Sequence, residues 1–381
     1  MKIVLAVDSF KGSLSSIAVI NELYESIERI MGKHEILKVP VADGGEGTVE
    51  ALVIATNGEY RSISTVNAFG SRIEATYGVI HQDTAVLEMA SVAGLAQVPE
   101  TERDPLLASS RCLGDLIISV MDAGFKKILI GIGGSVSNDG GIGLLSALGA
   151  MFYDNNNELL FGRGEDLERV ARIDLSGLDR RLSETDISVI CDVTNALLGE
   201  QGATYIYGPQ KGAVGEVLHR LEAGMRQYAD AFCRLGIDIA SIPGSGAAGG
   251  VGAALGCVLN ARLERGIDAV LNAVRFDELI SGADLVVTGE GRLDGQSVRY
   301  GKVPVGITKR CGEKDIPVAI IVGSVSDGWE AIFDLAKCSV FTTIDSPMSL
   351  ERAMKEAKEL LRSASDRMFR FISLLMPGNM R

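Results

Sequence analysis

The chain has 381 residues, of which 37 are basic and 50 acidic, giving a formal net charge of -13. A single hydrophobic core stops growing near ~250–300 residues, so we expect two domains. The acidic balance and an aromatic content of 5% argue against a nucleic-acid-binding protein, because such proteins present a basic face or stacking aromatic side chains.

The first sixty residues predict strands that alternate with helices. Residues 2–7 are apolar and predict a strand, and apolar side chains then recur at helical spacing over 17–30. A second predicted strand, 35–41, leads through a glycine-rich turn into a helix that ends near Asn57. The chain therefore opens as a βαβα segment.

The middle of the chain predicts an antiparallel insertion followed by mixed helices and strands. Short β-rich runs are expected at 61–66, 73–79 and 84–89, further strands at 127–132, 187–193 and 205–207, and helices at 106–123, 214–235 and 249–260. The stretch 239–261 is uncharged, but a proline and six glycines favour a glycine-rich turn and a buried helix over a membrane span.

The last hundred residues are typical of a parallel α/β sheet. Strands at 284–288, 317–322 and 338–343 are nearly continuous apolar runs, as in strands buried on both faces, and a long amphipathic helix begins near 348. Because both ends of the chain predict strands that alternate with helices, we expect a discontinuous, doubly wound domain of residues 1–60 and 285–381. Residues 61–284 then form an inserted domain with mixed or antiparallel strands.

Glycine and polar residues follow the predicted strands at their carboxyl ends, which is where open parallel sheets bind ligands. Three of these loops also carry hydroxyl groups and open a helix, and such loops bind phosphate through backbone N–H groups. The loops contain Asp8–Lys11, Asp43–Thr48, Gly133–Asp139, Asp192–Asn195 and Gly289–Ser297. For any single loop, a strand-to-helix turn capped by Ser or Asp is the alternative interpretation.

Charged side chains in these loops suit phosphate chemistry. Mg²⁺ takes one or two carboxylates together with phosphate oxygens, and a hydroxyl nucleophile needs a carboxylate to accept its proton. The candidate carboxylates are Asp43, Asp192, Glu290 and Asp294, and the candidate cations beside glycines are Lys11, Lys211, Arg292 and Lys302. The alternatives are helix caps for the carboxylates and solvated charges for the cations.

Several known motifs are absent. The dinucleotide fingerprint G-x-G-x-x-G fails at Gly131 and at Gly289, and the Walker A, protein-kinase, G-x-S-x-G and H-E-x-x-H patterns do not occur. The three histidines adjoin no glycine loop, so histidine-dependent nucleophilic catalysis and zinc chemistry are not expected. Six scattered cysteines without C-x-x-C, and no apparent signal peptide, favour a cytoplasmic protein.

The loops, taken in this order, resemble the glycerate kinase type 1 family, the bacterial glycerate 2-kinases. The matching stretches are 8–14, 40–52, 130–141, 191–193, 207–213, 243–250, 288–297 and 301–304, and the resemblance extends from residue 1 to about residue 365. The chain departs from the family pattern at 110–115, which lacks a threonine-rich Gly-Thr-Gly-Glu motif. It also departs at Val7, Thr194 and Ala196, which stand where Pro, Asp and Pro are usual.

The resemblance implies phosphoryl transfer from ATP, with Mg²⁺, to D-glycerate, giving 2-phosphoglycerate and ADP by attack of the 2-hydroxyl. It implies two α/β domains, one of them Rossmann- or flavodoxin-like, with the active site in the cleft between them. The partners are then the small-molecule substrate and ATP, with no nucleic acid and no membrane.

On this basis we assign hypothetical roles. Gly133, Gly134 and Ser135, or Gly289 and Gly291 in the 289–297 loop, hold the ATP phosphates together with Lys302. Asp192, with Asp43 or Asp294 as the next candidate, orients the glycerate hydroxyl and accepts its proton. Glu290 or Asp294 holds Mg²⁺, and Lys11 and Arg292 hold the substrate carboxylate or the transferred phosphoryl group.

Three alternatives stay open. The first is a kinase that attacks from the 3-hydroxyl or acts on another small hydroxy acid. The second is an NAD-dependent oxidoreductase, which the failed dinucleotide fingerprint disfavours. The third is a non-catalytic nucleotide sensor, which leaves the recurrent carboxylates unexplained.

Overall fold

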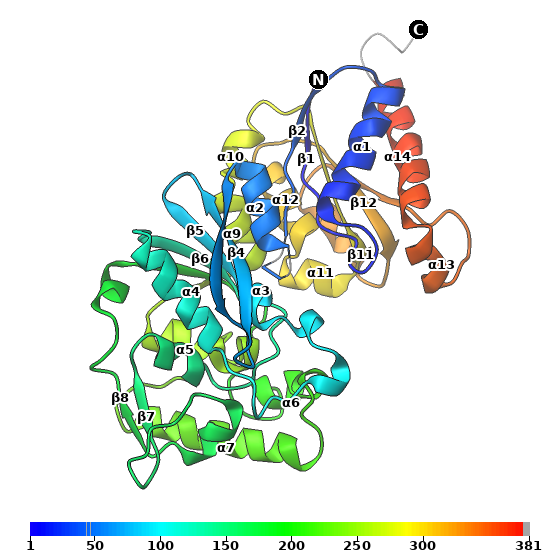
Figure 1. Ribbon diagram of the computed structural model, residues 1–381. Helices are drawn as coiled ribbons and strands as arrows, with labels where there is room; N and C mark the ends of the chain where they lie inside the picture. Colours follow the sequence, from blue (N-terminus) through cyan, green and yellow to red (C-terminus); the bar gives the residue numbers. More distant parts are fainter. Residues whose placement is uncertain (43, 46, 376–381) are drawn as a thin grey trace. The chain divides into compact units, whose positions relative to one another are not determined.

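The computed structural model describes residues 1–42, 44–45 and 47–375, and its contacts divide the chain into two compact units (Figure 1). Unit 1 comprises Met1–Asp43, Glu50–Asn57 and Gly266–Arg381, and unit 2 comprises Gly44–Val49 and Gly58–Arg265. The domain borders expected at residues 60 and 285 stay a prediction, because a compact unit of contacts is not by itself a folding domain.

Unit 1 contains a five-stranded sheet in the order β13-β12-β11-β1-β2, and every pairing in it is parallel. Its strands are β1 (Lys2–Leu5), β2 (Glu35–Lys38), β11 (Leu285–Leu293), β12 (Val318–Val325) and β13 (Cys338–Thr342). β1 pairs with β11 in the register Ile3 to Leu285. The first strand of the chain thus joins strands from its last hundred residues, which confirms the predicted parallel sheet built from both chain ends.

Helices α1 (Ser16–Ile30) and α14 (Ala357–Leu374) pack side by side in unit 1 (Figure 1). Ser15 caps α1 by accepting a hydrogen bond from the Ala18 N–H. Leu23 and Ile27 on α1 are fully buried in one cluster with Met368 of α14 and with apolar residues of β1 and β11. The apolar faces of both helices are therefore the reason that they cover the sheet.

The remaining helices assigned to unit 1 are short. They are α9 (Gly266–Ala273), α10 (Phe276–Leu279), α11 (Gly295–Tyr300), α12 (Val303–Gly312), the 3-10 helix η8 (Trp329–Asp334) and α13 (Leu350–Lys355), while α2 (Thr48–Thr56) contains residues of both units. Asp294 caps α11 through the N–H of Ser297 at 2.8 Å, and Pro304 occupies the first turn of α12.

Unit 2 contains a six-stranded mixed sheet in the order β10-β9-β6-β5-β4-β3. Its strands are β3 (Glu59–Val66), β4 (Arg72–Ile80), β5 (Thr84–Glu88), β6 (Lys127–Gly131), β9 (Asp186–Ile190) and β10 (Arg262–Glu264). β3, β4 and β5 pair antiparallel, as predicted, whereas β5, β6, β9 and β10 pair parallel. Two further strands, β7 (Met151–Tyr153) and β8 (Arg172–Asp174), form a separate antiparallel pair.

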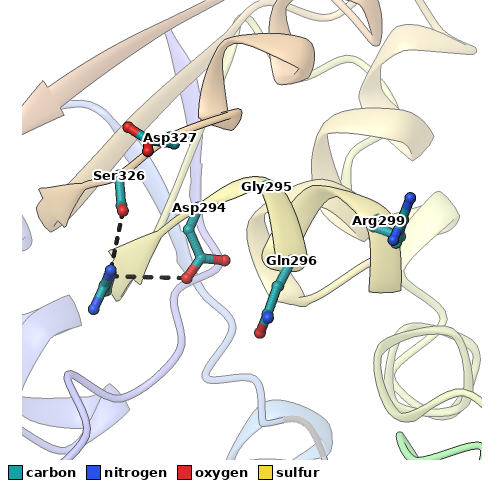
Figure 2. Close-up of a pocket in the computed structure, with 7 residues that line it drawn as sticks. Asp294, Gly295, Gln296, Arg299, Ser326 and Asp327 are labelled. Carbon is teal, nitrogen blue, oxygen red and sulfur yellow. Dashed lines mark hydrogen bonds and ion pairs between the residues drawn. The ribbon is translucent and has the colours of Figure 1, made fainter.

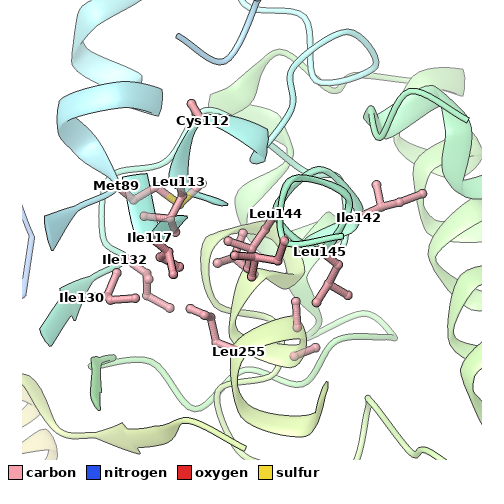
Figure 3. Packing of buried hydrophobic residues seen from close by; sticks show 14 of the residues in the cluster. Met89, Cys112, Leu113, Ile117, Ile130, Ile132, Ile142, Leu144, Leu145 and Leu255 are labelled. Atoms are coloured by element: carbon pink, nitrogen blue, oxygen red, sulfur yellow. The ribbon is translucent and has the colours of Figure 1, made fainter. Parts of the chain in front are cut away.

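One hydrophobic cluster fixes the carboxyl end of β6. Ile130 and Ile132 pack with Leu113 and Ile117 of α4 (Arg111–Asp122) and with Leu144 of α5 (Ile142–Ala147) (Figure 3). Other helical segments of unit 2 include α3 (Ala90–Ala93), η1 (Leu95–Gln97), η2 (Glu100–Glu102), η3 (Gly164–Arg169), η4 (Arg180–Glu184), α6 (Ala203–Tyr207), η5 (Pro209–Lys211) and α7 (Glu216–Cys233). The segment that follows β6 therefore begins from a rigid position.

Two predicted strands differ from the structure. The expected strand at 205–207 belongs to helix α6, where Ile206 and Gly208 donate backbone hydrogen bonds to Gly202 and Thr204. The expected strand at 284–288 continues to Leu293, because its ladder with β12 continues through Glu290 and Arg292. Gly289, Glu290, Gly291 and Arg292 are consequently strand residues and not members of a loop.

The expected helix at 249–260 is broken into three short turns. These are η6 (Ala247–Gly250), α8 (Val251–Ala253) and the π-helical turn η7 (Ala254–Val258). Ala248, Gly249 and Gly250 have φ angles of 52°, 70° and 99°, so the chain cannot enter a regular α-helix there. Among the helices of the described residues, none combines the length and apolar character that a membrane span requires.

Gly289 lies where two strands approach too closely for a side chain. A Cβ atom at this position would be 1.9 Å from the carbonyl oxygen of Ile321 on β12. We therefore expect Gly289→Ala to lower the free energy of unfolding by at least about 2 kcal/mol in urea titrations. Gly291→Ala on the same strand is the matched control, because its Cβ would meet no atom nearer than 3.4 Å and the change should stay within about 1 kcal/mol. Equal costs would contradict this account of β11.

Candidate functional site

The glycine-rich turn after β6 is held by backbone hydrogen bonds on both sides. The Gly133 N–H donates to Gly44 at 3.4 Å, the Gly134 carbonyl accepts from Leu95 at 2.7 Å, and the Val136 N–H donates to Ala93 at 2.8 Å. The N–H groups of Gly134 and Ser135 donate to no atom of the described residues. Two adjacent amide donors of a fixed turn are thus available to a ligand.

Two of the predicted glycine loops lie against each other in unit 2. A Cβ on Gly131 would be 2.8 Å from the Gly44 carbonyl oxygen, and a Cβ on Gly133 would be 2.9 Å from the Gly45 Cα. Gly134 has a φ of +69°, a conformation that glycine adopts without strain. Glycine is needed here because the two backbones approach too closely for a side chain. Binding of an oxyanion by these loops stays a prediction.

Asp139 anchors the far end of this turn. Its carboxylate is fully buried and accepts hydrogen bonds from the N–H groups of Ser110, Gly141 and Gly143 and from the Ser110 hydroxyl, at 2.7 to 3.3 Å. Burial raises the pKa of Asp139, and the hydrogen bonds oppose that rise. The carboxylate therefore ties the turn to the first residues of α4 and α5.

Lys211 supports the same turn from within unit 2. The side chain is 2% exposed, and its ammonium group donates to the Ser135 hydroxyl at 3.0 Å and to the Ser137 carbonyl at 2.6 Å. Burial lowers the pKa of Lys211 to about 7, while Asp139 acts in the opposite direction. Lys211 was only one of four candidate cations in the sequence and received no role. The sequence feature that could have identified Lys211 is its position between two glycines in the 207–213 stretch.

Asp192 lies at the same sheet edge as the turn. β9 runs parallel to β6 with Ile190 opposite Gly131, so Asp192 and Gly133 each lie two residues beyond paired strand ends. The Asp192 residue is exposed. The parallel pairing of β6 and β9 thus places the Asp192 carboxylate and the glycine-rich turn at the same end of the sheet. The sequence predicted these two features separately.

A second group of predicted residues surrounds β11 in unit 1. The Glu290 residue is only 6% exposed, and its Oε1 has no hydrogen-bond partner among the described residues. Burial raises the pKa of Glu290 to about 7; Lys302 and the Ser297 hydroxyl lower it, while the carboxylates of Asp8 and Asp294 raise it further. A cation bound beside Glu290 would favour its ionised form.

A polar cavity of about 630 Å³ opens beside this group (Figure 2). It is lined by Arg292, Asp294, Gly295, Gln296, Arg299, Ser326 and Asp327. Arg292 donates to the Ser326 hydroxyl at 3.0 Å and lies 3.8 Å from the Asp294 carboxylate, whereas Arg299 has no ion pair with any described residue. The hydrogen bond from the Ser297 N–H keeps the pKa of Asp294 below its ordinary value. The positive charges of Lys302 and Arg292 act in the same direction. Arg299 is a lining residue that no sequence pattern marked, whereas Gln296 belongs to the predicted 289–297 loop but received no role.

The predicted site residues therefore form two groups. Unit 1 contains Lys11, Gly289, Glu290, Gly291, Arg292, Asp294 and Lys302, and unit 2 contains Gly133, Gly134, Ser135 and Asp192. Lys11 is exposed, and its backbone nitrogen would be 3.4 Å from a Cβ on Gly291. Asp43 lies outside the described residues, so its predicted role is not addressed by the structure.

The oxygen ligands near Glu290 suit a magnesium ion whose coordination shell is completed by other ligands. Within the described part of the chain, no three His, Cys, Asp or Glu side chains converge closely enough to hold a metal ion. Mg²⁺ needs only one or two protein carboxylates when phosphate oxygens and water supply the rest. The buried, unpartnered Oε1 of Glu290 and the neighbouring Asp294 carboxylate fit that requirement.

Comparisons with known proteins give concordant results. A family model described as the glycerate kinase family matches residues 3–373. The chain is 42% identical to the glycerate 2-kinase of Escherichia coli strain K12 and 42% identical to the glycerate kinase of Bacillus subtilis strain 168, each over 96% of both chains. A crystal structure from Salmonella typhimurium LT2, provisionally named glycerate kinase 2, aligns with a TM-score of 0.85 at 42% identity over 98% of both chains.

Asp139 offers a direct test of what holds the glycine-rich turn. Asp139→Ala leaves three buried N–H groups and the Ser110 hydroxyl without their acceptor, so we expect a loss of at least about 3 kcal/mol in the free energy of unfolding. Asp122→Ala, which removes an exposed ion pair with Arg181, should cost less than about 1 kcal/mol. Urea titration measures both, and equal losses would show that Asp139 is no anchor.

Proposed function

This chain belongs to the glycerate kinase family, and from this premise we propose that it transfers a phosphoryl group from ATP to the 2-hydroxyl of D-glycerate, giving 2-phosphoglycerate and ADP. The family resemblance predicted from the sequence motifs is confirmed by the match over residues 3–373. The observation that carries the proposal is the 42% identity to a glycerate 2-kinase over 96% of both chains.

We assign the ATP phosphates to the turn at Gly134 and Ser135. Its two N–H groups, which have no acceptor among the described residues, suit the oxygens of a phosphate, and Lys211 adds positive charge through its contact with Ser135. The alternative at Gly289 and Gly291 is less favourable, because these residues belong to a strand that already pairs with β12. Lys302, beside Glu290, remains a second proposed contact for phosphate.

We assign the carboxylate of glycerate to the polar cavity beside β11. Arg292 offers a planar fork that matches a carboxylate, and Arg299 adds a second cation that no described carboxylate neutralises. A hydroxyl group of the substrate finds an acceptor in Asp327, which lines the same cavity. The backbone of Lys11 lies close to Gly291. We propose its side chain as a further contact for the glycerate carboxylate or the transferred phosphoryl group.

Asp192 is the proposed proton acceptor. As the glycerate oxygen forms its bond to the γ-phosphorus and the bond to the ADP oxygen breaks, the hydroxyl proton passes to a carboxylate. Asp192 is exposed and lies at the sheet edge that carries the Gly134 turn, which supports this choice. Asp43 is the next candidate.

Glu290 and Asp294 are the proposed residues that hold Mg²⁺. A bound Mg²⁺ supplies positive charge that offsets the charge of the phosphate oxygens. Glu290 contributes a buried oxygen with no partner among the described residues, and Asp294 contributes a carboxylate whose pKa is already lowered. The protein thus presents two carboxylates and leaves other positions for the nucleotide and water.

We place the reaction in the cytoplasm. All six cysteines lie in the described part of the chain and none forms a disulfide bond. Free thiols at this density are usual in a reducing compartment, which supports the proposal.

A coupled assay of ADP release with D-glycerate tests the proposed activity, and ³¹P NMR of the product tests the position of attack. The expected result is ATP-dependent turnover with D-glycerate and a phosphorus signal coupled to the proton on C2. A signal coupled to the C3 protons would support the 3-kinase alternative. Turnover only with another hydroxy acid would correct the substrate, and nicotinamide turnover would overturn the kinase assignment.

Asp192→Asn tests the proposed base. The amide cannot accept the proton, so kcat should fall by ~10²–10⁴-fold while the KM for ATP changes little. Asp186→Asn, at the other end of the same strand, removes an exposed ion pair with Arg262 and should leave kcat within about twofold. A kcat for Asp192→Asn within about threefold of wild type would exclude Asp192 as the base.

A further inference from the structure

Lys211 is a buried cation whose direct partners among the described residues are neutral. Its ammonium group has three donors, and two of them reach the Ser135 hydroxyl and the Ser137 carbonyl. No ion pair joins Lys211 to a described carboxylate; Asp139 influences it only through space. Burying a charge without a paired counter-ion is costly, and that cost is reflected in the fall of the Lys211 pKa to about 7. An anion near Ser135 would supply the missing compensation.

The segment that carries Lys211 is connected to the segment that holds Gly134. Arg103 donates to the carbonyl of Gln210 at 3.0 Å and to the carbonyls of Val98 and Leu95 at 3.1 and 3.3 Å. Leu95 in turn donates its N–H to the Gly134 carbonyl at 2.7 Å. The lysine and the turn are therefore held in one hydrogen-bonded frame.

This frame leaves Gly134 on the accessible part of the turn, while Ser135 as a whole is only 4% exposed. Gly134 is exposed, whereas the Ser135 side chain is buried with its hydroxyl on Lys211. The N–H groups of Gly134 and Ser135 have no acceptor among the described residues. A phosphate bound to these amides would lie close to Ser135, whose hydroxyl accepts a hydrogen bond from the ammonium group of Lys211.

We propose that Lys211 is a positioning residue for nucleotide phosphate: it fixes the Gly134 and Ser135 amides through Ser135 and Ser137 and adds positive charge to the site they form. The identity of the ligand as ATP rests on the proposed function. The lysine itself is too deeply enclosed to contact the phosphate, so it acts through the turn.

The proposal predicts a selective loss of nucleotide affinity. Lys211→Met keeps the length of the apolar stem but removes the charge and both hydrogen bonds. We expect the Kd of the non-hydrolysable analogue AMP-PNP, measured by calorimetry on the full chain, to rise at least about tenfold. In the kinetic assay, the KM for ATP should rise by a similar factor, while the KM for D-glycerate should stay within about twofold.

Three further variants separate positioning from stability. Ser135→Ala removes the hydroxyl that links Lys211 to the turn and should raise the Kd for AMP-PNP about threefold, which tests the proposal even if Lys211→Met does not fold. Glu222→Gln is the matched control for Lys211→Met, because Glu222 is a buried charge in the same unit that binds Gly199 and Arg226 instead. Ser365→Ala, whose buried hydroxyl bonds to Leu361, is the control for Ser135→Ala. Both controls should bind AMP-PNP as the wild type does.

Three outcomes would overturn the inference. These are an unchanged Kd in folded Lys211→Met or in Ser135→Ala, a parallel rise in the KM of both substrates, and a wild-type chain that binds no AMP-PNP. If the wild-type chain binds AMP-PNP but does not phosphorylate D-glycerate, the proposed function fails while the affinity ratios still decide the role of Lys211.

Discussion

The geometry of unit 2 depends on two buried charged groups that fix one turn. Asp139 collects four hydrogen bonds at the far end of the turn after β6, and Lys211 supports Ser135 and Ser137 at its near end. Charges are expensive to bury unless they are hydrogen-bonded, so the surrounding core must hold both groups in place. The result is a turn whose amides are oriented before any ligand binds, which is the arrangement that phosphoryl transfer needs.

Unit 1 contributes a different kind of chemistry. There the strand β11 carries Glu290 into a buried position, with Lys302 and Asp294 close enough to alter its pKa. Beside it, an open polar cavity presents two arginines and two aspartates. The proposed division of labour follows from these differences: fixed amides suit phosphate, paired carboxylates suit a hard cation, and exposed arginines suit a small carboxylate.

Much of this arrangement could be predicted from local sequence patterns. The apolar runs predicted the parallel sheet built from both chain ends, and the β1–β11 pairing confirms it. The glycine blocks marked the turn at Gly133–Ser135 and the segments that pack on it. Local sequence patterns failed to predict features that depend on contacts between residues distant in the sequence. The extension of β11 beyond residue 288 depends on its pairing with β12, and the helix at 203–207 forms although its tyrosines and isoleucine favour a strand.

The burial of Lys211 also could not be predicted from its neighbours in the sequence. Its neighbours in sequence suggest a solvated turn, but the fold buries the side chain beneath residues 135–137. Only the packed structure distinguishes such a lysine from the exposed Lys11 and Lys302, which also lie beside glycines.

The most direct measurement of the central idea is an NMR titration of chain labelled with ¹⁵N-glycine, in which AMP-PNP is added and the amide signals are followed. The account predicts that the Gly134 signal shows the largest downfield proton shift, because its N–H gains a charged acceptor. The signals of Gly289 and Gly291, whose residues lie in a paired strand, should shift less than the signal of Gly134. A large shift at Gly289 or Gly291 with an unchanged Gly134 signal would contradict it.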